Sequence, residues 1–381
     1  MCYKDLFYSL YFYLMSYITA LNTANPIFSI SQEQSANFSA HFMGKTKNEK
    51  RKIRILQRAT GIKNRYTVIE DYTKNENFEF YPNAENLEPF PSTSKRMKMY
   101  EKWATKLGLE AAKPIINGRE KEITHLITVS CTGMFAPGID IEILEKLNLK
   151  SSVQRTSINF MGCYASFNAL KVADAFCKAH NATVLIVGVE LCTLHFQKKS
   201  DDDNLLANSI FADGAAALLV ESKPKPNTTN LLLRKFYCDL VPKGKPDMAW
   251  YIRDTGFEMR LSSYVADILG EKIQTILDKL MTGLNIDRND EAISQWAVHP
   301  GGKKILETLA KKLSMDKKKL DVPFKIWEEF GNMSSVTVLF VLKELLKNKE
   351  KYQLKNHQLI PSLAFGPGLT IESALFEVIE A

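Results

Sequence analysis

Nearly continuous apolar runs recur along the chain and predict β-strands. They cover residues 123–133, 182–191, 214–222, 292–300 and 359–379. Their residues do not alternate between apolar and polar, which is typical of strands buried on both faces. Helical patterns lie between these runs, so the sequence predicts an α/β fold with a mixed or mostly parallel sheet covered by helices on both sides.

Periodic apolar positions predict helices over 29–44, 48–66 and 91–116. A further amphipathic pattern begins directly after Cys163, and another follows Asn332. A polar residue followed by a helix therefore occurs twice, which suggests two similar halves.

The junction between the halves is expected in SKPKPNTTN (222–230), a break rich in proline, asparagine and lysine. This division gives one half over 15–226 and a second over 227–381. Residues 1–14 are apolar and aromatic, but they are short for a membrane span and no cleavage site follows. We expect them to be an upstream extension, with Met15 as the natural start and no membrane anchor.

Composition describes a globular chain large enough for two cores. Its 381 residues are 45% apolar and 24% charged, with a net charge of +7. Lysines alternate with acidic residues, which is typical of solvated helix faces and does not favour a nucleic-acid partner. The modest positive charge suits a small anionic substrate such as a nucleotide-bearing thioester.

The six cysteines are spread without a CxxC pair or a Cys/His cluster. We therefore expect no metal site and no disulfide framework, and unpaired cysteines agree with a cytoplasmic protein. Cys177 and Cys238 are interpreted as small buried hydrophobes.

Cys163 stands apart because it lies in INFMGCYAS, between an apolar run and a predicted helix. A thiol at a helix N-terminus is favoured as thiolate, and Gly162 permits a sharp turn that would expose the sulfur. On this observation alone, a buried structural cysteine has equal weight.

Two further polar residues occupy similar corners. His299 in WAVHPGG ends a predicted strand before a proline and two glycines, and Asn332 in FGNMSS precedes a helix. Alone, Asn332 would be an N-cap. Three such corners of an α/β sheet can converge on one pocket, since these folds bind ligands beyond the strand ends. A thiolate, an imidazole and an amide donor together support nucleophilic acyl transfer.

Seven segments between Met15 and the C-terminus resemble the type III polyketide synthases, the chalcone and stilbene synthase family with a thiolase-like fold. The segments are ALNTANP, LITVSCTGMFAPGIDIEI, INFMGCYAS, IFADGAAALLV, WAVHPGGKKILE, GNMSSVTVLFVLKE and FGPGLTIE. The resemblance implies two similar halves in a layered α-β-α-β-α sandwich with mixed sheets, a bacterial-type member, and a homodimer with GMFAPG (133–138) near the partner's cavity.

The resemblance also implies the reaction. Cys163 would accept the acyl group from an acyl-CoA starter, and His299 and Asn332 would drive decarboxylation of malonyl-CoA and stabilise the enolate. The product would be of the pyrone, resorcinol or phloroglucinol type. The CoA thioesters are substrates, so no cofactor is expected.

Cavity positions follow by motif. Phe211 matches a gatekeeper phenylalanine, Met259 stands where the plant enzymes have a second one, and Cys192, with His195 nearby, replaces a threonine. The alternative for Met259 is ordinary core filling. As a tunnel residue, its flexible side chain would admit medium or long aliphatic starters.

Further substrate contacts are expected from Gly301, Gly302 and Ser334 within the matching segments. The basic residues Lys52, Arg58 and Lys63 correspond to the region that binds CoA phosphates in the family, although a solvated helix face explains them equally well.

Three rival functions share parts of this pattern. A ketoacyl-carrier-protein synthase III has the same fold, but it would carry His-Gln-Ala-Asn in place of HPGG. A papain-like protease would carry its own cysteine signature, which is absent. A non-catalytic relative would be expected to lack one of Cys163, His299 and Asn332, and all three are present.

Overall fold

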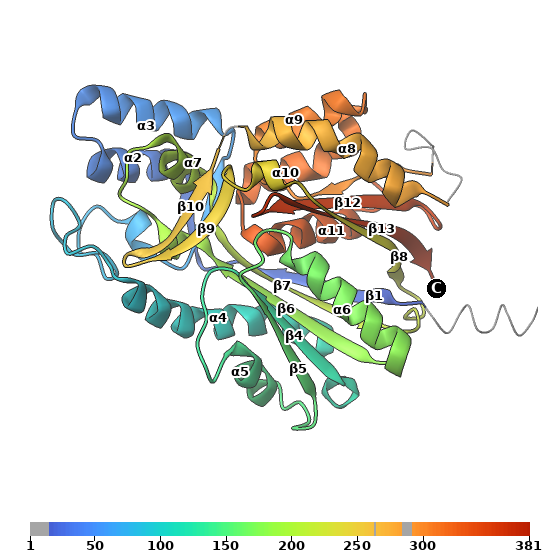
Figure 1. Ribbon diagram of the computed structural model, residues 1–381. Coiled ribbons are helices and arrows are strands. Elements are labelled where there is room, and N and C mark those ends of the chain that lie inside the picture. Colours follow the sequence, from blue (N-terminus) through green and yellow to red (C-terminus); the bar gives the residue numbers. More distant parts are fainter. Residues whose placement is uncertain (1–14, 263, 284–291) are drawn as a thin grey trace, which may run out of the picture.

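The computed structural model describes residues 15–262, 264–283 and 292–381 (Figure 1). The expected extension at 1–14 lies outside these residues. Nine of the described strands form one large sheet in the order β11-β12-β13-β8-β1-β7-β6-β4-β5, with parallel and antiparallel neighbours. Their bounds are β1 (Tyr17–Ala24), β4 (His125–Ser130), β5 (Gln154–Asn159), β6 (Thr183–Leu191), β7 (Asp213–Glu221), β8 (Thr229–Leu240), β11 (Ala297–Val298), β12 (Leu359–Gly366) and β13 (Thr370–Glu380).

Helices cover and divide this sheet. Helix α4 packs on β7, β1 and β6, and α5 packs on β4. On the other side, α6 and α11 lie between the strands of the two halves, and α8 covers β8 and β13. The bounds are α4 (Thr93–Ile116), α5 (Ile139–Lys146), α6 (Ala165–His180), α8 (Val265–Met281), α9 (Lys303–Lys312), α10 (Asp321–Phe330) and α11 (Thr337–Lys347). The result is the layered α/β arrangement that the sequence predicts (Figure 1).

Smaller elements surround one end of the sheet. Strands β2 (Phe28–Ser31) and β3 (Asn64–Thr67) form one antiparallel pair, and β9 (Met248–Arg253) and β10 (Gly256–Leu261) form a hairpin. Helices α2 (Gln32–Met43), α3 (Lys47–Ala59) and α7 (Asp202–Ile210) pack beside them. The β9–β10 hairpin crosses in front of this group in Figure 1 and supplies part of the candidate site.

Most predicted elements are observed, with shifted ends. The run at 359–379 divides into β12 and β13, whereas the run at 292–300 contains only the short β11. The predicted helix at 48–66 is wrong beyond Ala59, because Gly61 has a φ of +74° and the chain continues into β3. The prediction at 29–44 is wrong at its start, where β2 precedes α2 and Ser31 forms a capping box.

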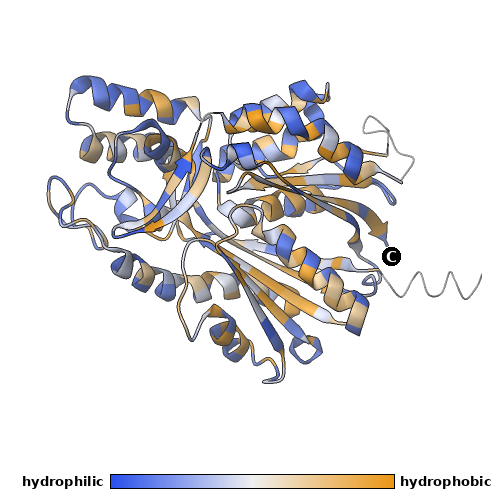
Figure 2. Ribbon diagram, in the orientation of Figure 1, coloured by the Kyte–Doolittle hydropathy of each residue, from blue (hydrophilic) through white to orange (hydrophobic). Residues whose placement is uncertain are grey.

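The core lies between the sheet and the helices, as the apolar residues along the central strands show (Figure 2). The predicted burial of Cys177 is confirmed, whereas that of Cys238 is wrong: Cys238 is exposed on β8. Within the described residues, no helix has both the length and the apolar character to cross a bilayer.

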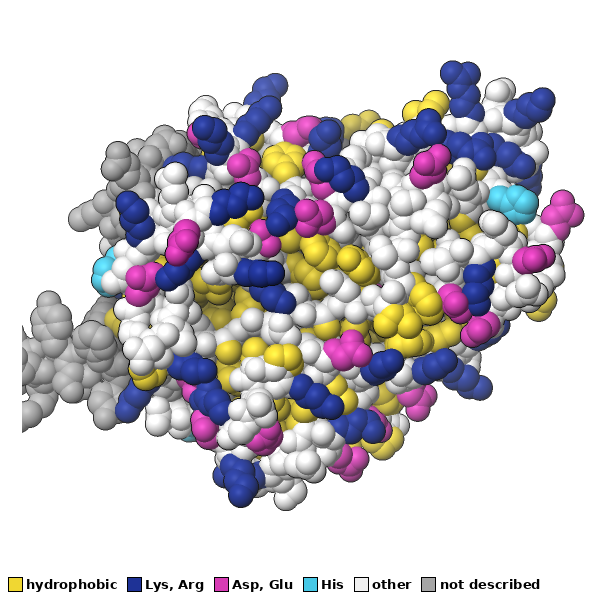
Figure 3. Space-filling view, turned by 180° about the vertical axis from the view of Figure 1, so that it is seen from behind, with side chains coloured by type: hydrophobic (Ala, Val, Ile, Leu, Met, Phe, Trp, Pro, Cys, Tyr) yellow, Lys and Arg dark blue, Asp and Glu magenta, His cyan; other side chains and the backbone are white. Residues whose placement is uncertain are grey.

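The surface seen from behind mixes positive and negative side chains (Figure 3). Lysine and arginine gather more densely at the upper right of this view, over α2 and α3. The charged residues of α3 are mostly basic and exposed, as its sequence KNEKRKIRILQRA indicates.

Candidate active site

The turn before α6 holds Cys163 in a conformation that depends on Gly162. Gly162 has a φ of +92°, and a Cβ there would lie 2.3 Å from Cδ of Pro367. A side chain at Gly162 would therefore be strained and would collide with the FGPG segment. Helix α6 begins at Ala165 without a side-chain cap, so Cys163 lies just before its open N-terminus, as the sequence predicts.

The thiol is nevertheless not held as a thiolate in this state. Cys163 is 2% exposed, and burial raises its pKa to about 12. The side chain of Ser334 lowers the pKa and the charge of Glu190 raises it, but both effects are smaller than burial. The expected lowering by the helix N-terminus is therefore outweighed by loss of solvent.

His299 lies in a similarly dry position. It is 0% exposed, and neither Nδ1 nor Nε2 has a hydrogen-bond partner among the described residues. Burial lowers its pKa to about 3, so the imidazole is neutral at pH 7. Its backbone N–H donates to the carbonyl of Leu363 on β12 at 2.7 Å, which fixes the chain at the end of β11.

The side-chain amide of Asn332 lies beside the loop that carries His299. Its Oδ1 accepts the backbone N–H of Ser334 at 2.9 Å, and its Nδ2 lies 3.4 Å from the carbonyl oxygen of Gly301. The N-cap interpretation is wrong, because Met333 and Val336 are the residues that precede η6 (Ser334–Val336) and α11, and neither helix has a side-chain cap. The amide nitrogen of Asn332 is directed towards the His299 loop. Ser334 has a φ of +48°, a left-handed conformation that places its side chain by Cys163.

A chain of contacts joins the three predicted residues. Cys163 interacts with Ser334, Ser334 with Asn332, and Asn332 with Gly301. Gly301 in turn contacts the ring of His299, since a Cβ on it would lie 3.3 Å from Nε2. The structure thus brings together residues that are up to 169 positions apart, as in the 2.6 Å hydrogen bond from Ser166 on α6 to the carbonyl of Ser335.

Glu190 is a buried carboxyl at this site that the sequence analysis missed. It accepts the backbone N–H of Cys131 at 2.9 Å and the hydroxyl of Thr132 at 3.0 Å, and it bonds the hydroxyl of Ser335. Burial raises its pKa to about 7, although these hydrogen bonds oppose the shift. An acidic residue inside the apolar run VLIVGVEL was the available signal.

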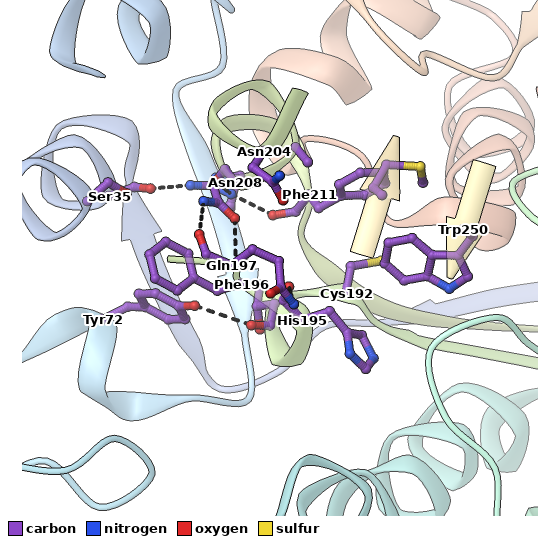
Figure 4. A pocket seen from close by; sticks show the side chains of 15 residues that line it. Ser35, Tyr72, Cys192, His195, Phe196, Gln197, Asn204, Asn208, Phe211 and Trp250 are labelled. Carbon is purple, nitrogen blue, oxygen red and sulfur yellow. Dashed lines mark hydrogen bonds between the residues drawn. The ribbon is translucent and has the colours of Figure 1, made fainter. Parts of the chain in front are cut away.

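A small cavity of about 30 Å³ is lined by residues from α2, α7 and the β9–β10 hairpin, among others (Figure 4). Phe211, Met259 and Cys192 all line it, as their motif positions suggest. Phe211 also pairs with Asn332 in a backbone bridge, so the cavity and the Asn332 corner share a wall. Cys163, His299 and Asn332 do not themselves line this cavity.

Two aromatic residues of the cavity wall had no assigned role in the sequence. His195 is 4% exposed and forms two ring hydrogen bonds, Nε2 with the carbonyl of Thr132 at 2.7 Å and Nδ1 with the N–H of Phe257 at 3.0 Å. Nε2 must therefore carry the proton. Trp250 donates its indole N–H to the carbonyl of Cys131 at 2.8 Å.

The three basic candidates lie on the surface near the end of α3. Lys52 pairs with Asp202 at 2.7 Å and Lys63 pairs with Glu328 at 2.5 Å, while Arg58 is exposed. Two of the three are held in surface ion pairs, and binding of CoA phosphates by this group stays a prediction. Gly61, between Arg58 and Lys63, lies next to Lys303, which directly follows Gly302. Space around Gly302 is open, since a Cβ there would meet nothing within 4 Å.

Sequence comparisons place the chain among known enzymes. A family model described as the N-terminal domain of chalcone and stilbene synthases matches residues 15–224, and the corresponding C-terminal model matches 233–380. The chain is 30% identical over 371 residues to probable polyketide synthase 1 of Dictyostelium discoideum, covering 95% of this chain but 11% of that protein. It is 29% identical over 291 residues to the α-pyrone synthesis polyketide synthase-like Pks18 of Mycobacterium tuberculosis, covering 74% of this chain and 73% of that protein.

Solved structures of similar fold extend over nearly the whole chain. The C-terminal type III polyketide synthase domain of Steely1, a type I/III hybrid from Dictyostelium, has a TM-score of 0.86 at 25% identity, covering 96% of this chain and 99% of the domain. PKS-I from the brown alga Ectocarpus siliculosus has a TM-score of 0.88 at 24% identity, covering 96% and 98%. Because these relatives include an amoeba, an alga and a bacterium, a bacterial type remains a prediction.

Proposed function

Because this chain belongs to the chalcone and stilbene synthase family of acyltransferases, we propose that it primes with an acyl-CoA, extends the acyl group with malonyl-CoA and releases a cyclised polyketide. The observation that carries this proposal is the contact chain from Cys163 through Ser334, Asn332 and Gly301 to His299, whose ring nitrogens find no partner within the ranges that the structure describes. It combines a nucleophile, a proton acceptor and an amide donor in a dry site.

Loading begins with two neutral groups. The Cys163 thiol, with its pKa raised to about 12, and the neutral His299 imidazole can exchange a proton when the thioester arrives. The thiolate sulfur then bonds to the thioester carbonyl, and the bond to the CoA sulfur breaks. The imidazolium proton passes to the departing CoA thiolate, so the products are acyl-Cys163 and free CoA thiol.

Extension requires a carbanion, which decarboxylation supplies. Loss of carbon dioxide from malonyl-CoA leaves an enolate whose oxygen can accept hydrogen bonds from Asn332 Nδ2 and a protonated His299 nitrogen. The enolate carbon attacks the acyl-Cys163 carbonyl, and the thiolate leaves. Because both donors lie in a buried site, their hydrogen bonds to the enolate are stronger than they would be in water.

The decisive experiment is mass spectrometry of products formed from a panel of acyl-CoA starters with malonyl-CoA. We expect cyclised products that contain the starter and whole malonyl-derived units, of the pyrone, resorcinol or phloroglucinol type. The α-pyrone named for the mycobacterial relative supports a pyrone as the first product to search for. Turnover only with thioesters carried by an acyl carrier protein would instead support a ketoacyl synthase III-like enzyme.

A homodimer is part of the proposal. Strand β5 is an edge of the sheet with alternately exposed residues, and Met134 and Met161 beside it are 44% and 38% exposed. An open edge with neighbouring apolar side chains suits pairing with a second copy. Light scattering should give twice the 43.2 kDa of one chain, and Met161→Asp should shift the mass towards the monomer. A monomeric wild type at micromolar concentration would contradict this part.

A further inference from the structure

We propose that the sulfur of Cys131 positions the nucleophile Cys163, by holding both backbone polar groups of Gly162, the residue that directly precedes it. The backbone N–H of Gly162 donates to Cys131 Sγ at 3.0 Å, and the Cys131 thiol donates to the carbonyl of Gly162 at 3.4 Å. This inference rests on the proposed function, in which Cys163 accepts the acyl group. Cys131 acts through Gly162 and is therefore a positioning residue.

The sulfur replaces a backbone acceptor that would continue the sheet. Strands β4 and β5 are parallel, and their hydrogen bonds extend to the one from the N–H of Phe160 to the carbonyl of Ser130 at 3.1 Å. Two residues further along, the N–H of Gly162 would donate next to the carbonyl of Thr132. That carbonyl instead bonds Nε2 of His195 at 2.7 Å. The N–H that the ladder leaves over is the one that meets the sulfur.

The turn before Cys163 needs such a hold, because its backbone is strained. Phe160 has a φ of +62°, a left-handed conformation that is uncommon for a bulky residue, and Gly162 follows with a φ of +92°. Backbone strain of this kind persists only where the surrounding contacts enforce it. Gly162 is buried, so without the sulfur its N–H would be a buried donor without a partner.

The sulfur is a rigid anchor, because the main chain of Cys131 is held on both sides. Its N–H donates to Oε2 of Glu190 at 2.9 Å, and its carbonyl accepts the indole N–H of Trp250 at 2.8 Å. Cys131 is 3% exposed, and burial, followed by the charge of Glu190, raises the pKa of its thiol well above the ordinary value. The sulfur therefore keeps the proton that it donates to Gly162.

The position of this turn decides where the nucleophile lies. Cys163 follows Gly162 directly, before the open N-terminus of α6, and its side chain interacts with Ser334. A displacement of reacting atoms by about 1 Å can lower a rate roughly a hundredfold. Release of Gly162 should therefore slow the attack of the sulfur on a thioester. Decarboxylation of malonyl-CoA, which uses His299 and Asn332, should not depend on this turn.

The first test compares Cys131→Ala with Cys131→Ser in the full-length protein. Cys131→Ala removes both hydrogen bonds to Gly162 and should lower the single-turnover rate of Cys163 acylation by acetyl-CoA by about tenfold to a hundredfold. Release of carbon dioxide from malonyl-CoA should stay unchanged. Cys131→Ser retains a donor and an acceptor and should restore most of the acylation rate.

Alkylation of Cys163 by iodoacetamide gives a second readout that needs no substrate. Burial raises the pKa of Cys163 to about 12, and a loosened turn should admit solvent and lower that pKa towards its ordinary value. The midpoint of alkylation against pH, followed by peptide mass spectrometry, should therefore move to lower pH in Cys131→Ala. The thiol thus becomes easier to ionise while its acylation slows, a combination that marks lost positioning.

Cys177→Ala is the matched control. Cys177 is also a buried cysteine, 1% exposed, and its thiol donates to the carbonyls of Ala182 and Val220, both at 3.4 Å. Its replacement removes the same atoms and two hydrogen bonds, but at the opposite end of α6 from Cys163. Cys177→Ala should leave the acylation rate and the alkylation midpoint at their wild-type values.

Each outcome has a distinct meaning. A folded Cys131→Ala with either readout at the wild-type value overturns the inference, and so does a Cys131→Ser variant as slow as Cys131→Ala. An equal change in Cys177→Ala would assign the effect to lost packing and also overturn it. If Cys131→Ala fails to fold, Cys131→Val, which fills the space but forms neither bond, decides the question. A wild-type Cys163 that no acyl-CoA acylates contradicts the proposed function, while the alkylation midpoint still judges Cys131.

Discussion

The pKa values of two buried histidines are shifted in the same direction, but the hydrogen bonding of their ring nitrogens differs. Burial lowers the pKa of both His195 and His299 to about 3. Yet both ring nitrogens of His195 are hydrogen-bonded to backbone groups, whereas those of His299 have no partner in the described part of the chain. The comparison teaches that a shifted pKa does not separate a wall residue from a reactive one, while the state of its hydrogen bonds does.

Hydrogen bonding separates the two histidines because burying a polar atom without a partner costs free energy. A buried polar atom without a partner loses about 1–3 kcal/mol of its solvation, so proteins leave few of them. His299 is three residues from the open space at Gly302 and in contact with Gly301, where a substrate could supply the missing partner. Both ring nitrogens of His195 are hydrogen-bonded without any ligand. The predictions below test this difference.

The largest effect is expected at the nucleophile beside His299. Cys163→Ala should abolish the covalent acyl adduct, because no other group in the contact chain can form a thioester. Intact-protein mass spectrometry after incubation with an acyl-CoA measures the adduct directly. Cys131 and Cys192 are internal controls, since both are buried nearby. A stoichiometric adduct on either of them in Cys163→Ala would contradict the assignment.

The next effect is expected at the amide donor. Asn332→Ala should lower the rate of chain extension by about a hundredfold to a thousandfold, the usual cost of one oxyanion donor. Acylation of Cys163 should persist, because Asn332 acts on the enolate. Single-turnover acylation and product formation, measured separately, resolve the two steps. Extension at the wild-type rate would mean that Asn332 only accepts the backbone N–H of Ser334.

Matched substitutions of the histidines should give opposite results. His299→Gln should stop malonyl-CoA decarboxylation with little loss of stability, since no hydrogen bond is removed. His195→Gln should retain decarboxylation but lose about 1–3 kcal/mol in the free energy of unfolding, because Thr132 and Phe257 lose their partner. Urea unfolding and carbon dioxide release measure the two quantities. If both variants lose decarboxylation, or if both lose only stability, the proposed difference between the two histidines is wrong.

The two histidines should, however, affect the pH dependence of stability in the same way. An unfolded histidine binds a proton below about pH 6.5, whereas the folded ones resist protonation until about pH 3. Their contribution to stability is therefore full above pH 6.5 and falls towards pH 3, by about 1.4 kcal/mol per pH unit for each group. Glutamine at either position should flatten this slope by one proton in urea titrations between pH 4 and 6.5.

Glu190 should have the opposite effect on the pH dependence of stability. Its folded pKa is raised to about 7, so its contribution is present below its unfolded pKa, near pH 4.3, and is lost as the pH rises to 7. A Glu190→Gln variant should therefore steepen the fall of stability on acidification. If the slopes of the histidine variants match the wild type, the two imidazoles are not neutral in the folded protein.

The smallest effect is expected at Met259, which lines the cavity. Met259→Phe should shift starter preference modestly towards small or aromatic acyl groups, because a rigid ring would replace a flexible side chain in the cavity wall. Malonyl-CoA decarboxylation, which needs only His299 and Asn332, should not change. Competition between two starters in one reaction measures the preference. An unchanged preference would identify Met259 as core filling.

Local patterns in the sequence were sufficient for the parts of the fold that are buried on both faces. The apolar runs at 123–133, 182–191 and 214–222 became β4, β6 and β7, because continuous apolar residues leave few other ways to be buried. Strand β5 was missed since it is an edge strand with exposed residues. The corner at Gly162 and Cys163 was predictable because glycine, thiol and helix start are neighbours in the chain.

Other features depended on contacts that no local pattern records. Trp250 meets Cys131 across 119 positions and His195 meets Thr132 across 63, so these hydrogen bonds form only once distant segments pack together. The pKa of Cys163 shows the same limit: its place before α6 predicted a thiolate, and burial raised the pKa to about 12. The sequence by itself determined which chemical groups stand at the strand ends. Tertiary structure alone decided which of them are solvated, hydrogen-bonded or left without a partner, because solvent exclusion depends on segments distant in the chain.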